Sequence, residues 1–460
     1  MHGNTQSLAA PQAATAPISR AAKPSTAVSQ PEKLTCRLIQ STDDLDEVAE
    51  DWISLATSSK GSPFQSFAWN RAWLQHFSED YDELAVFSFS RGKEPAAIFP
   101  FYRQGRCLRL AGDTDGDLQD AIATDESAAQ EGLREVMRWA RRNGCHLKML
   151  SISERGRLHG AARSIGLLRN RAFRFQRGYS TCLYADLPES ADAWIQQLPR
   201  KVRGDMRRHV NKLDRQHPEA KVAIHRAGEV PEGLVERVAA FHDEHFRKDG
   251  VSLMRDPRVV DLIADAARCP DSGLRVSTLT DGDKLMAVDI GFTFNRTYHG
   301  FLTSFDPAYR KISPGTCLLM KRLDWFIKDD GVRCLDFLLG AERYKSQFAQ
   351  ESYEVGATYL FPWSISNAFR WASVAAKRVI KILAKKTLAE SAVYKMAKTA
   401  IKGKPAGAPE KTVEVTAEKS PFQVLKPEGD LAAQKEAERA RVAKIAGGAA
   451  EKEAGKRSAA

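Results

Sequence analysis

The stretch from Asp306 to Thr316 combines residue types that can bind phosphate. It reads Asp-Pro-Ala-Tyr-Arg-Lys-Ile-Ser-Pro-Gly-Thr and joins the end of a predicted strand to a predicted helix start. Free backbone N–H groups at a helix N-terminus attract anions, and glycine lets an anion approach the backbone closely. The alternative is an ordinary capped helix, since helix starts far outnumber phosphate sites. The candidate phosphate-binding residues are Arg310, Lys311, Ser313, Pro314, Gly315 and Thr316.

A second group of polar residues surrounds the end of a short apolar strand. Asp336 lies inside the run Cys-Leu-Asp-Phe-Leu-Leu, where an unpaired carboxylate is costly, so it must face a cleft or have a partner. Glu342, Tyr344 and Lys345 follow shortly after Gly340. We expect Asp336 and these three residues to cluster beside the helix that starts near Pro314. The alternative is a structural ion pair between Asp336 and a Lys or Arg.

Other arrangements that could carry chemistry give weaker signals. His242 and His245 are three residues apart in a predicted helix, but zinc needs a third ligand, and the sequence shows none. Cys317 lies at a helix start, which can lower a thiol pKa, although a buried small residue is the simpler interpretation. Neither a Walker loop nor a Gly-x-Ser-x-Gly elbow occurs. We predict no metal site.

Both polar groups fall in the second of two units of similar design, at about residues 219–363. Ser313 is predicted to cap the helix that begins at Pro314. The order of helices, hairpin, crossover helix and final strands indicates an α+β fold with a mixed α/β sheet. The predicted bounds are Lys221–His225, Pro231–Lys248, Pro257–Cys269, Leu274–Thr280, Lys284–Phe294, Tyr298–Phe305, Pro314–Asp330, Val332–Leu339 and Ala357–Phe361, with a short helix around Glu342–Gln350.

The first unit spans about residues 34–190. Thr42 and Asp43 are predicted to cap its first helix, and its second helix carries Trp69, Trp73 and Phe77. No strand is predicted between residues 153 and 190. The other predicted elements are Cys36–Ile39, Asp44–Ser58, Leu84–Ser90, Ala96–Tyr102, Leu108–Leu110, Ser127–Asn143 and Leu147–Ile152.

A basic linking helix, Pro199–Gln216, is predicted within residues 191–218, between the two units. Apolar residues follow helical spacing on one face, and the opposite face is basic. That basic face is either an ordinary solvated surface or a positive wall facing phosphates or an anionic polymer. The apolar face consists of Val202, Met206, Val210 and Leu213.

Most of the net charge of +11 lies in one segment of the 460-residue chain. Residues 366–404 hold ten Lys or Arg against one acid, whereas residues 1–365 hold 49 basic and 48 acidic residues. This distribution weakens the case for nucleic-acid binding, which the net charge alone would suggest. Residues 366–402 are predicted to form basic amphipathic helices, with either a solvated face or an interfacial face on anionic lipid.

The chain ends are predicted not to belong to the folded body. Residues 1–33 are rich in Ala, Ser, Thr and Pro and are predicted to be disordered. Residues 403–460 are predicted to be a linker followed by a charged tail, with a lone helix over 431–457. The sequence has no secretory signal and no membrane span, and its seven widely spaced cysteines favour a reducing compartment. We therefore predict a cytoplasmic protein.

As a set, five motifs resemble the GNAT-like acyltransferase family of the CelD/BcsL type, which is associated with bacterial cellulose and exopolysaccharide biosynthesis. The resemblance covers roughly residues 35–363 and implies two GNAT-like units in tandem, as in Fem-type transferases. The motifs are Ser-Pro-Phe-x-Ser-x-x-Trp (62–69), Leu-Pro-Arg-Lys-x-Arg (198–203), Phe-Asp-Pro-x-Tyr (305–309), Ser-Pro-Gly-Thr (313–316) and Asp-Phe-x-x-Gly-x-x-x-Tyr-Lys (336–345).

The resemblance implies acyl transfer from acyl-CoA, with acetyl-CoA expected, to an amine or a hydroxyl. The family's pyrophosphate loop, Arg/Gln-x-x-Gly-x-Gly/Ala, corresponds here to Arg310-Lys-Ile-Ser-Pro-Gly, which has a single glycine. Attack by an amine needs a general base. Tyr344 could protonate the leaving thiolate. The candidate catalytic residues are Asp336, Asp289, His299, Tyr344 and Lys345; alternatively, Asp289 and His299 simply face solvent.

Two other functions remain open from the sequence. The first is a Fem-type aminoacyl transferase, in which the basic linking helix would meet tRNA or a nucleotide-linked precursor. The second is a non-catalytic GNAT-like scaffold, which the incomplete glycine loop favours. The predicted partners are acyl-CoA and an amine-bearing acceptor, with peripheral contact to an anionic membrane at the inner face through residues 366–402. The sequence leaves the acceptor, the acyl chain and the general base undetermined.

Overall fold

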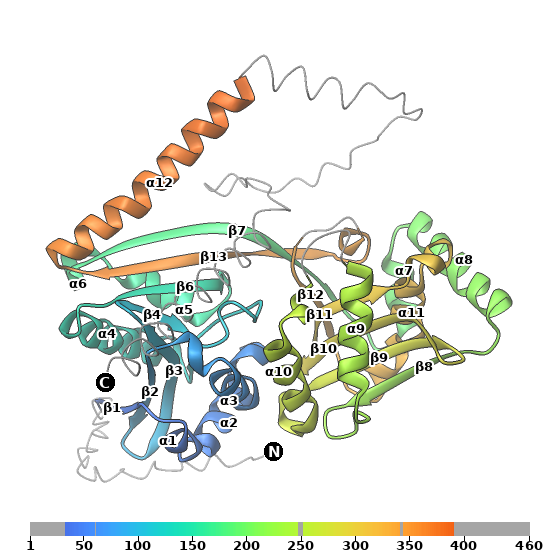
Figure 1. The fold of residues 1–460 in the computed structure, drawn as a ribbon, viewed down its shortest axis with the longest axis horizontal. Coiled ribbons are helices and arrows are strands. Elements are labelled where there is room, and N and C mark those ends of the chain that lie inside the picture. Colours follow the sequence, from blue (N-terminus) through green and yellow to red (C-terminus); the bar gives the residue numbers. More distant parts are fainter. Residues whose placement is uncertain (1–32, 60, 247–251, 341–343, 391–460) are drawn as a thin grey trace, which may run out of the picture. The chain divides into compact units, whose positions relative to one another are not determined.

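The computed structural model describes residues 33–59, 61–246, 252–340 and 344–390 (Figure 1). The predictions for residues 1–32 and 403–460 lie outside these ranges. Glu342 also lies outside them, as does the part of the predicted basic helices that follows residue 390.

One mixed sheet of 13 strands organises this part of the chain. Its order is β1-β2-β3-β4-β6-β13-β7-β12-β11-β10-β9-β8, and β5 pairs with β3. Neighbours run antiparallel except for two parallel pairs, β4 with β6 and β11 with β12. The predicted α+β class with a mixed sheet is confirmed. The strands are β1 Leu34–Ile39, β2 Glu83–Arg91, β3 Glu94–Gln104, β4 Cys107–Leu110, β5 Ile122–Ala123, β6 His146–Ser153, β7 Ala172–Asp186, β8 Ala220–Arg226, β9 Leu274–Asp281, β10 Lys284–Phe294, β11 Thr297–Phe305, β12 Cys334–Leu339 and β13 Glu351–Pro362.

The sheet order repeats one arrangement twice. In each half, four antiparallel strands are followed by a parallel fifth strand: β1-β2-β3-β4-β6 in one half and β8-β9-β10-β11-β12 in the other. A long helix makes the crossover to that fifth strand, α4 (Glu126–Arg142) in the first half and α11 (Pro314–Lys328) in the second. This repetition agrees with two GNAT-like units of similar design.

Strands β7 and β13 lie between the two halves and belong to both. β7 pairs with β13 from Tyr184 to Ala172, and it also pairs with β12; β13 pairs with β6 as well. Strand β7 was therefore missed in the sequence, where no element was assigned to residues 153–190. The alternation of Phe173, Phe175 and Tyr179 with polar residues is a strand signal, but Gly178 interrupts it. The last strand is also longer than the predicted Ala357–Phe361.

The helices follow the predicted segments closely in the second half. The predicted single helix over Asp44–Ser58 is instead two helices with a break at residues 47–48, and Thr42 makes no side-chain capping bond. The helices are α1 Asp43–Asp46, α2 Ala49–Ser58, α3 Phe67–His76, α4 Glu126–Arg142, α5 Arg157–Ser164, α6 Leu167–Asn170, α7 Ala191–Gln197, α8 Arg200–Gln216, α9 Leu234–Phe246, α10 Pro257–Arg268, α11 Pro314–Lys328 and α12 Ile365–Glu390. Short 3-10 helices occur at Pro63–Gln65, Ser78–Asp80, Leu253–Arg255, Pro270–Ser272, Pro307–Ile312 and Lys345–Gln347.

The motif Ser-Pro-Phe-x-Ser-x-x-Trp has a structural role. Ser66 caps α3 by accepting a hydrogen bond from the Trp69 backbone. The rings of Phe64 and Trp69 then pack edge-on against Phe292 of β10, at centroid distances of 5.8 and 5.6 Å. Aromatic contacts of this kind add to the free energy of burial. The motif therefore joins the two halves of the molecule.

Helix α8 has the predicted two-sided character. Met206 and Leu213 are buried, whereas Arg207, Arg208 and Arg215 are exposed to solvent. None of the helices in the described ranges has the length and apolar character needed to span a bilayer.

Candidate functional site

The parallel strands β11 and β12 pair for three residues and then diverge. The pairs are Thr297 with Cys334, Tyr298 with Leu335, and His299 with Asp336. Beyond His299 and Asp336 the two strands are not paired with each other. Backbone groups that no longer pair must find other partners or meet solvent. The gap between the strands is therefore a place where a ligand with amide groups can bind.

A cavity of about 340 Å³ occupies this region. The cavity extends from the point where β11 and β12 diverge to the N-terminus of α11. Nine of the eleven predicted site residues line it. The two that do not line it are His299 and Lys311. The lining residues are Asp289, Tyr298, Gly300, Thr303, Phe305, Arg310, Ser313, Pro314, Gly315, Thr316, Leu319, Arg322, Leu335, Asp336, Phe337, Tyr344, Lys345 and Phe348.

The N-terminus of α11 is open to an anion. Ser313 makes no side-chain capping bond, and the first turn contains no acidic residue. The first N–H groups of a helix lack intrahelical partners, and together with the helix dipole they favour negative charge. A Cβ atom built on Gly315 has no heavy atom within 4 Å, so the space over this backbone is free. A diphosphate group fits the donor set and the room at this position.

The prediction that the Ser313 side chain caps α11 was wrong. Ser313 has a left-handed backbone, with φ 56° and ψ 61°, and its Oγ lies 3.4 Å from His209 Nε2 of α8 instead. This residue occupies the position of the first glycine in the loop pattern that the resemblance implies. Glycine adopts positive φ without a steric penalty, and serine adopts it at a cost. The loop therefore keeps a glycine-like backbone although it has a single glycine.

Helix α8 supports the same loop from one side. Lys212 donates a hydrogen bond from Nζ to the Lys311 carbonyl at 3.2 Å, and His209 contacts Ser313. Lys311 itself is exposed and lies outside the cavity lining. The basic helix thus has a solvated face and also holds the loop in place.

Asp336 is buried where the two strands diverge. Its Oδ2 accepts a hydrogen bond from Tyr353 Oη at 2.7 Å, and its Oδ1 accepts one from the Leu338 backbone N–H at 2.8 Å. Burial raises the pKa of Asp336 to about 6, although both hydrogen bonds act to lower it. Within the described residues, Asp336 forms these two hydrogen bonds and no ion pair with a Lys or Arg, although the charges of Arg155 and Lys345 also act to lower its pKa. A carboxyl with this pKa is suited to accepting a proton near neutral pH.

Asp289 takes part in a buried ion pair. It bonds to Arg322 of α11 and to the Tyr298 hydroxyl, and Thr303 Oγ1 donates to its Oδ2 at 2.8 Å. The side chains of Asp289 and Arg322 are each 5% exposed. The alternative that Asp289 faces solvent is therefore wrong. Its carboxylate oxygens are already committed to these three partners.

His299 is also buried, although it does not line the cavity. Its ring Nδ1 has no hydrogen-bond partner among the described residues. Burial lowers the pKa of His299 to about 3, because a charged imidazolium would lose its hydration. The alternative that His299 faces solvent is therefore wrong, and burial keeps its imidazole neutral at physiological pH.

Tyr344 and Lys345 lie together at one end of the cavity. The Tyr344 side chain is half-exposed, whereas Lys345 is buried and donates from Nζ to the Leu339 carbonyl at 2.8 Å. The short 3-10 helix Lys345–Gln347 carries this lysine inward. The described part of the predicted Glu342–Gln350 helix is limited to this single turn.

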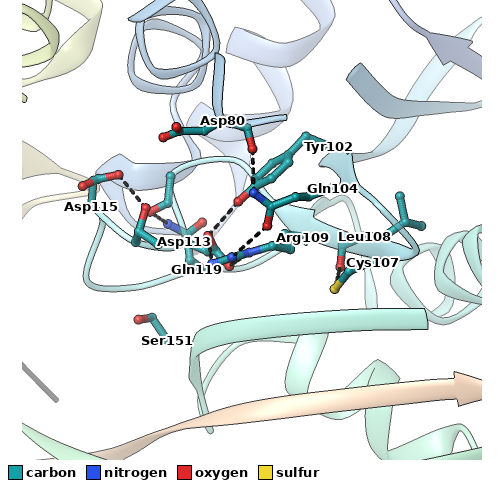
Figure 2. Close-up of polar contacts among 12 residues, drawn as sticks. Asp80, Tyr102, Gln104, Cys107, Leu108, Arg109, Asp113, Asp115, Gln119 and Ser151 are labelled. Carbon is teal, nitrogen blue, oxygen red and sulfur yellow. Dashed lines mark hydrogen bonds and ion pairs between the residues drawn. The ribbon is translucent and has the colours of Figure 1, made fainter. Parts of the chain in front are cut away.

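In the first half, the corresponding gap between β4 and β6 is filled by the chain itself. Strand β4 pairs with β6 at Cys107 and Leu108, and the next bridge to β6 comes from Gln119 of the following loop. A buried network fixes that loop: the Arg109–Asp113 ion pair at 3.0 Å and a hydrogen bond from Tyr102 Oη to Asp113, both drawn in Figure 2. This half therefore has no open equivalent of the β11–β12 gap at that place.

The N-terminus of α4 is also closed to anions. Its N-cap residue Asp125 accepts a hydrogen bond from the Ala128 backbone at 2.7 Å, and Glu126 lies in the first turn. Two carboxylates at this position repel a phosphate and already satisfy the helix dipole. Of the two crossover helices, α11 is the one prepared for an anionic donor.

The weaker candidates have structural explanations. His242 Nδ1 lies 2.7 Å from Ser252 Oγ, and His245 Nδ1 lies 2.8 Å from the Phe241 carbonyl. No group of three potential metal ligands occurs among the described residues. Cys317 is buried, and burial raises its pKa to about 12, opposite to the lowering that a helix start can give.

Comparison with known families identifies the second half of the chain. Residues 200–346 match the family model described as "Acetyltransferase (GNAT) domain". These residues form a GNAT acetyltransferase domain. The chain is thus an acyltransferase, as predicted. The GNAT domain contains β11, α11, β12 and nearly all of the cavity lining, but β13 with Tyr353 lies beyond the matched range.

Several solved structures resemble the chain at low sequence identity. FemX has a TM-score of 0.49 at 8% identity, covering 71% of this chain and 96% of that one. A structure named as the C-terminal domain of a lysylphosphatidylglycerol synthetase from Agrobacterium fabrum has a TM-score of 0.47 at 12% identity, covering 72% and 96%. A tandem GNAT protein from the clavulanic acid biosynthesis pathway has a TM-score of 0.41 at 12% identity, covering 71% and 98%. No curated protein matches the sequence.

Three residues of the site were not found from the sequence. Tyr353, Arg322 and His209 come from β13, α11 and α8, and each contacts a residue that was predicted. Arg322 had a weak signal, because an arginine on the apolar side of a helix needs a buried partner. Tyr353 and His209 had none, since their partners are set by the sheet and by helix packing.

Proposed function

We propose that this chain is an acyl-CoA-dependent N-acyltransferase, with acetyl-CoA as the donor. The observation that carries the proposal is the continuity of one cavity, from the uncapped helix start at Gly315 to the buried carboxyl of Asp336. The helix start would hold the donor diphosphate, assisted by Arg310. The diverging strands β11 and β12 would hold the peptide-like pantetheine arm through their unpaired backbone groups.

In this proposal, the residues around the gap prepare the acceptor and the leaving group. Asp336 is largely ionised at pH 7 and accepts the proton of the attacking amine. Backbone N–H groups where β11 and β12 separate polarise the acyl carbonyl, which is where negative charge develops. The phenol of Tyr344, which lines the cavity, donates a proton to the departing thiolate. The Asp289–Arg322 ion pair would hold α11 against β10, and these two residues would not transfer protons.

The proposed biological role is assembly of an exopolysaccharide, cellulose or another part of the cell envelope. It rests on the motifs that resemble the CelD/BcsL type. A Fem-type aminoacyl transferase is the second candidate, and the exposed basic face of α8 beside the loop supports it. Such an enzyme would bind tRNA with strong salt dependence.

Isothermal titration calorimetry of the full chain with acetyl-CoA tests the proposal. We expect one binding site per chain, because the corresponding helix start in the first half is closed. Gly315→Glu should abolish binding through repulsion and bulk at the diphosphate, while Gly315→Ala, which meets no neighbouring atom, should retain it. Absence of heat with acetyl-CoA and with longer acyl-CoAs would exclude the donor assignment. Tight, salt-sensitive tRNA binding in its place would favour the Fem-type alternative.

A further inference from the structure

Large apolar side chains gather on the surface where β7 begins and β13 ends. Four of the six large hydrophobic residues that are exposed in the described chain lie in this region. They come from two segments far apart in the sequence, and both segments meet beside α6 and the start of α12 (Figure 1). These four residues, Leu167, Trp363, Ile365 and Phe369, are called the apolar patch here.

Hydrogen bonds and ring contacts hold the two segments together. The Trp363 backbone N–H donates to the Arg171 carbonyl at 2.7 Å, and the Trp363 ring lies 5.3 Å from that of Phe173. Phe173 also stacks on Trp371 of α12 at 5.2 Å. Ile365 and Phe369 stand on α12 and are 76% and 73% exposed. Such exposure in a cluster is unusual for a monomeric surface and marks a binding face.

The two chain segments that form the apolar patch are rich in basic residues. Residues 157–177 contain six arginines and no acid, and residues 362–377 contain Arg370 and Lys377 and no acid. Arg163, Arg171, Arg174 and Lys377 are exposed. A water-soluble protein partner with mixed surface charge would leave this excess of basic residues unmatched. A partner surface with negatively charged groups lying directly over apolar groups would match both the basic residues and the apolar patch.

We propose that the apolar patch and the surrounding arginines dock the protein on the surface of an anionic lipid bilayer. The side chains of Trp363, Ile365 and Phe369 would enter the boundary between headgroups and acyl chains, while the arginines contact lipid phosphates. This combination supplies the two signals, apolar insertion and basic attraction, that stable peripheral binding requires. It extends the predicted lipid contact of residues 366–402 to a second segment, 157–177.

Docking at the apolar patch leaves the catalytic cavity accessible. Strand β13 connects the two places: Tyr353 at its beginning bonds to Asp336, and Trp363 follows its end. Ten residues of extended chain span up to about 33 Å. The proposal is therefore independent of the donor assignment, and a variant of the apolar patch should bind acetyl-CoA as the wild type does.

Co-sedimentation of the full chain with lipid vesicles tests the proposal. We expect binding to vesicles of phosphatidylcholine mixed with phosphatidylglycerol, and little binding to phosphatidylcholine alone. The double variant Ile365→Asp with Phe369→Asp should lower the partition coefficient by at least about tenfold, since two large side chains no longer insert. Ile53→Asp is the matched control, because Ile53 is also exposed but lies on α2, away from the patch.

A charge variant and a folding measurement complete the test. Arg171→Glu with Lys377→Glu should weaken binding by about tenfold or more, and salt should reduce the difference. Thermal unfolding of both double variants should match that of the wild type, because all four side chains are exposed. Failure of the wild type to bind anionic vesicles would overturn the proposal. So would binding of the Asp double variant at wild-type strength.

Discussion

Tyr353 Oη lies 2.7 Å from Asp336 Oδ2, and this hydrogen bond crosses over a strand that separates the two residues in the sheet. Tyr353 belongs to β13 and Asp336 to β12, with β7 between them. The donated bond favours the ionised carboxyl, whereas burial favours the protonated one. The balance leaves Asp336 with a pKa of about 6, so this pair sets the proton affinity of the proposed base.

The acyltransferase activity should depend on the ionisation of Asp336. We expect kcat/KM to rise with pH through an apparent pKa near 6, and Asp336→Asn to lower it by about 10²- to 10⁴-fold at pH 7.5. The measurement is a pH–rate profile with acetyl-CoA and a model amine. A flat profile between pH 5 and 8 would contradict the assignment.

The stability of the same variant provides a separate check. Because burial raises the folded-state pKa of Asp336 above its ordinary value of about 4, the folded protein holds this proton more tightly than the unfolded chain. The contribution of this group to stability therefore falls as pH rises from about 4 to above 6. Asp336→Asn should lack this fall, so urea unfolding at pH 8 should show no loss of stability relative to wild type. A marked loss would mean that the low activity reports misfolding.

Removal of the Tyr353 hydroxyl should shift the pH profile upward. Tyr353→Phe deletes the bond that stabilises the Asp336 carboxylate, so the apparent pKa should rise above that of the wild type. At high pH the variant should regain much of the wild-type rate. Tyr81→Phe is a matched control, because Tyr81 donates to the Leu74 carbonyl, away from the cavity. An unchanged midpoint in Tyr353→Phe would separate Tyr353 from the proton transfer.

The backbone conformation at Ser313 should matter more than its hydroxyl. Ser313→Gly accommodates the φ of 56° without strain, so we expect donor affinity to be retained. Ser313→Val places a β-branched residue in the left-handed region, which should cost at least about 1–2 kcal/mol and weaken donor binding. Calorimetric affinities of the two variants measure the contrast. Equal weakening in both would instead assign the role to the Oγ contact with His209.

Asp289 should prove to be a structural residue. Asp289→Asn leaves Arg322 buried without its carboxylate, and we expect a loss of about 3–5 kcal/mol in the free energy of unfolding. Glu47→Gln is the control, since the Arg37–Glu47 pair is exposed to solvent and its loss should leave the stability nearly unchanged. If Asp289→Asn were fully stable but inactive, Asp289 would replace Asp336 as the candidate base.

The sequence predicted most of the helices and strands around the candidate site. Helical spacing placed α8, α10 and α11 within a few residues of their bounds, although Ser313 does not cap α11, and an isolated carboxylate in an apolar strand pointed to Asp336. These signals are local, because helix starts and strand periodicity depend on neighbouring residues. The grouping of Gly315 with Asp336 followed from strand order in the second half.

The central pair of strands was not predictable in the same way. β7 alternates large and polar residues, but its partners β12 and β13 lie well over a hundred residues later. Which strands share a sheet depends on contacts between distant segments, and sequence periodicity does not report them. The joining of both halves by β7 and β13 is therefore visible in the structure alone.

By itself, the sequence determined which residues carry charge and where several helices begin. It also showed that most of the net positive charge lies in one segment. The tertiary structure decided which of those residues act together. It buried Asp289 against Arg322, excluded His299 from the cavity and placed Tyr353 on Asp336. The physical reason is that a pKa, an ion pair and a cavity depend on burial and on neighbours in space. Burial and spatial neighbours are set only when distant segments of the chain pack together.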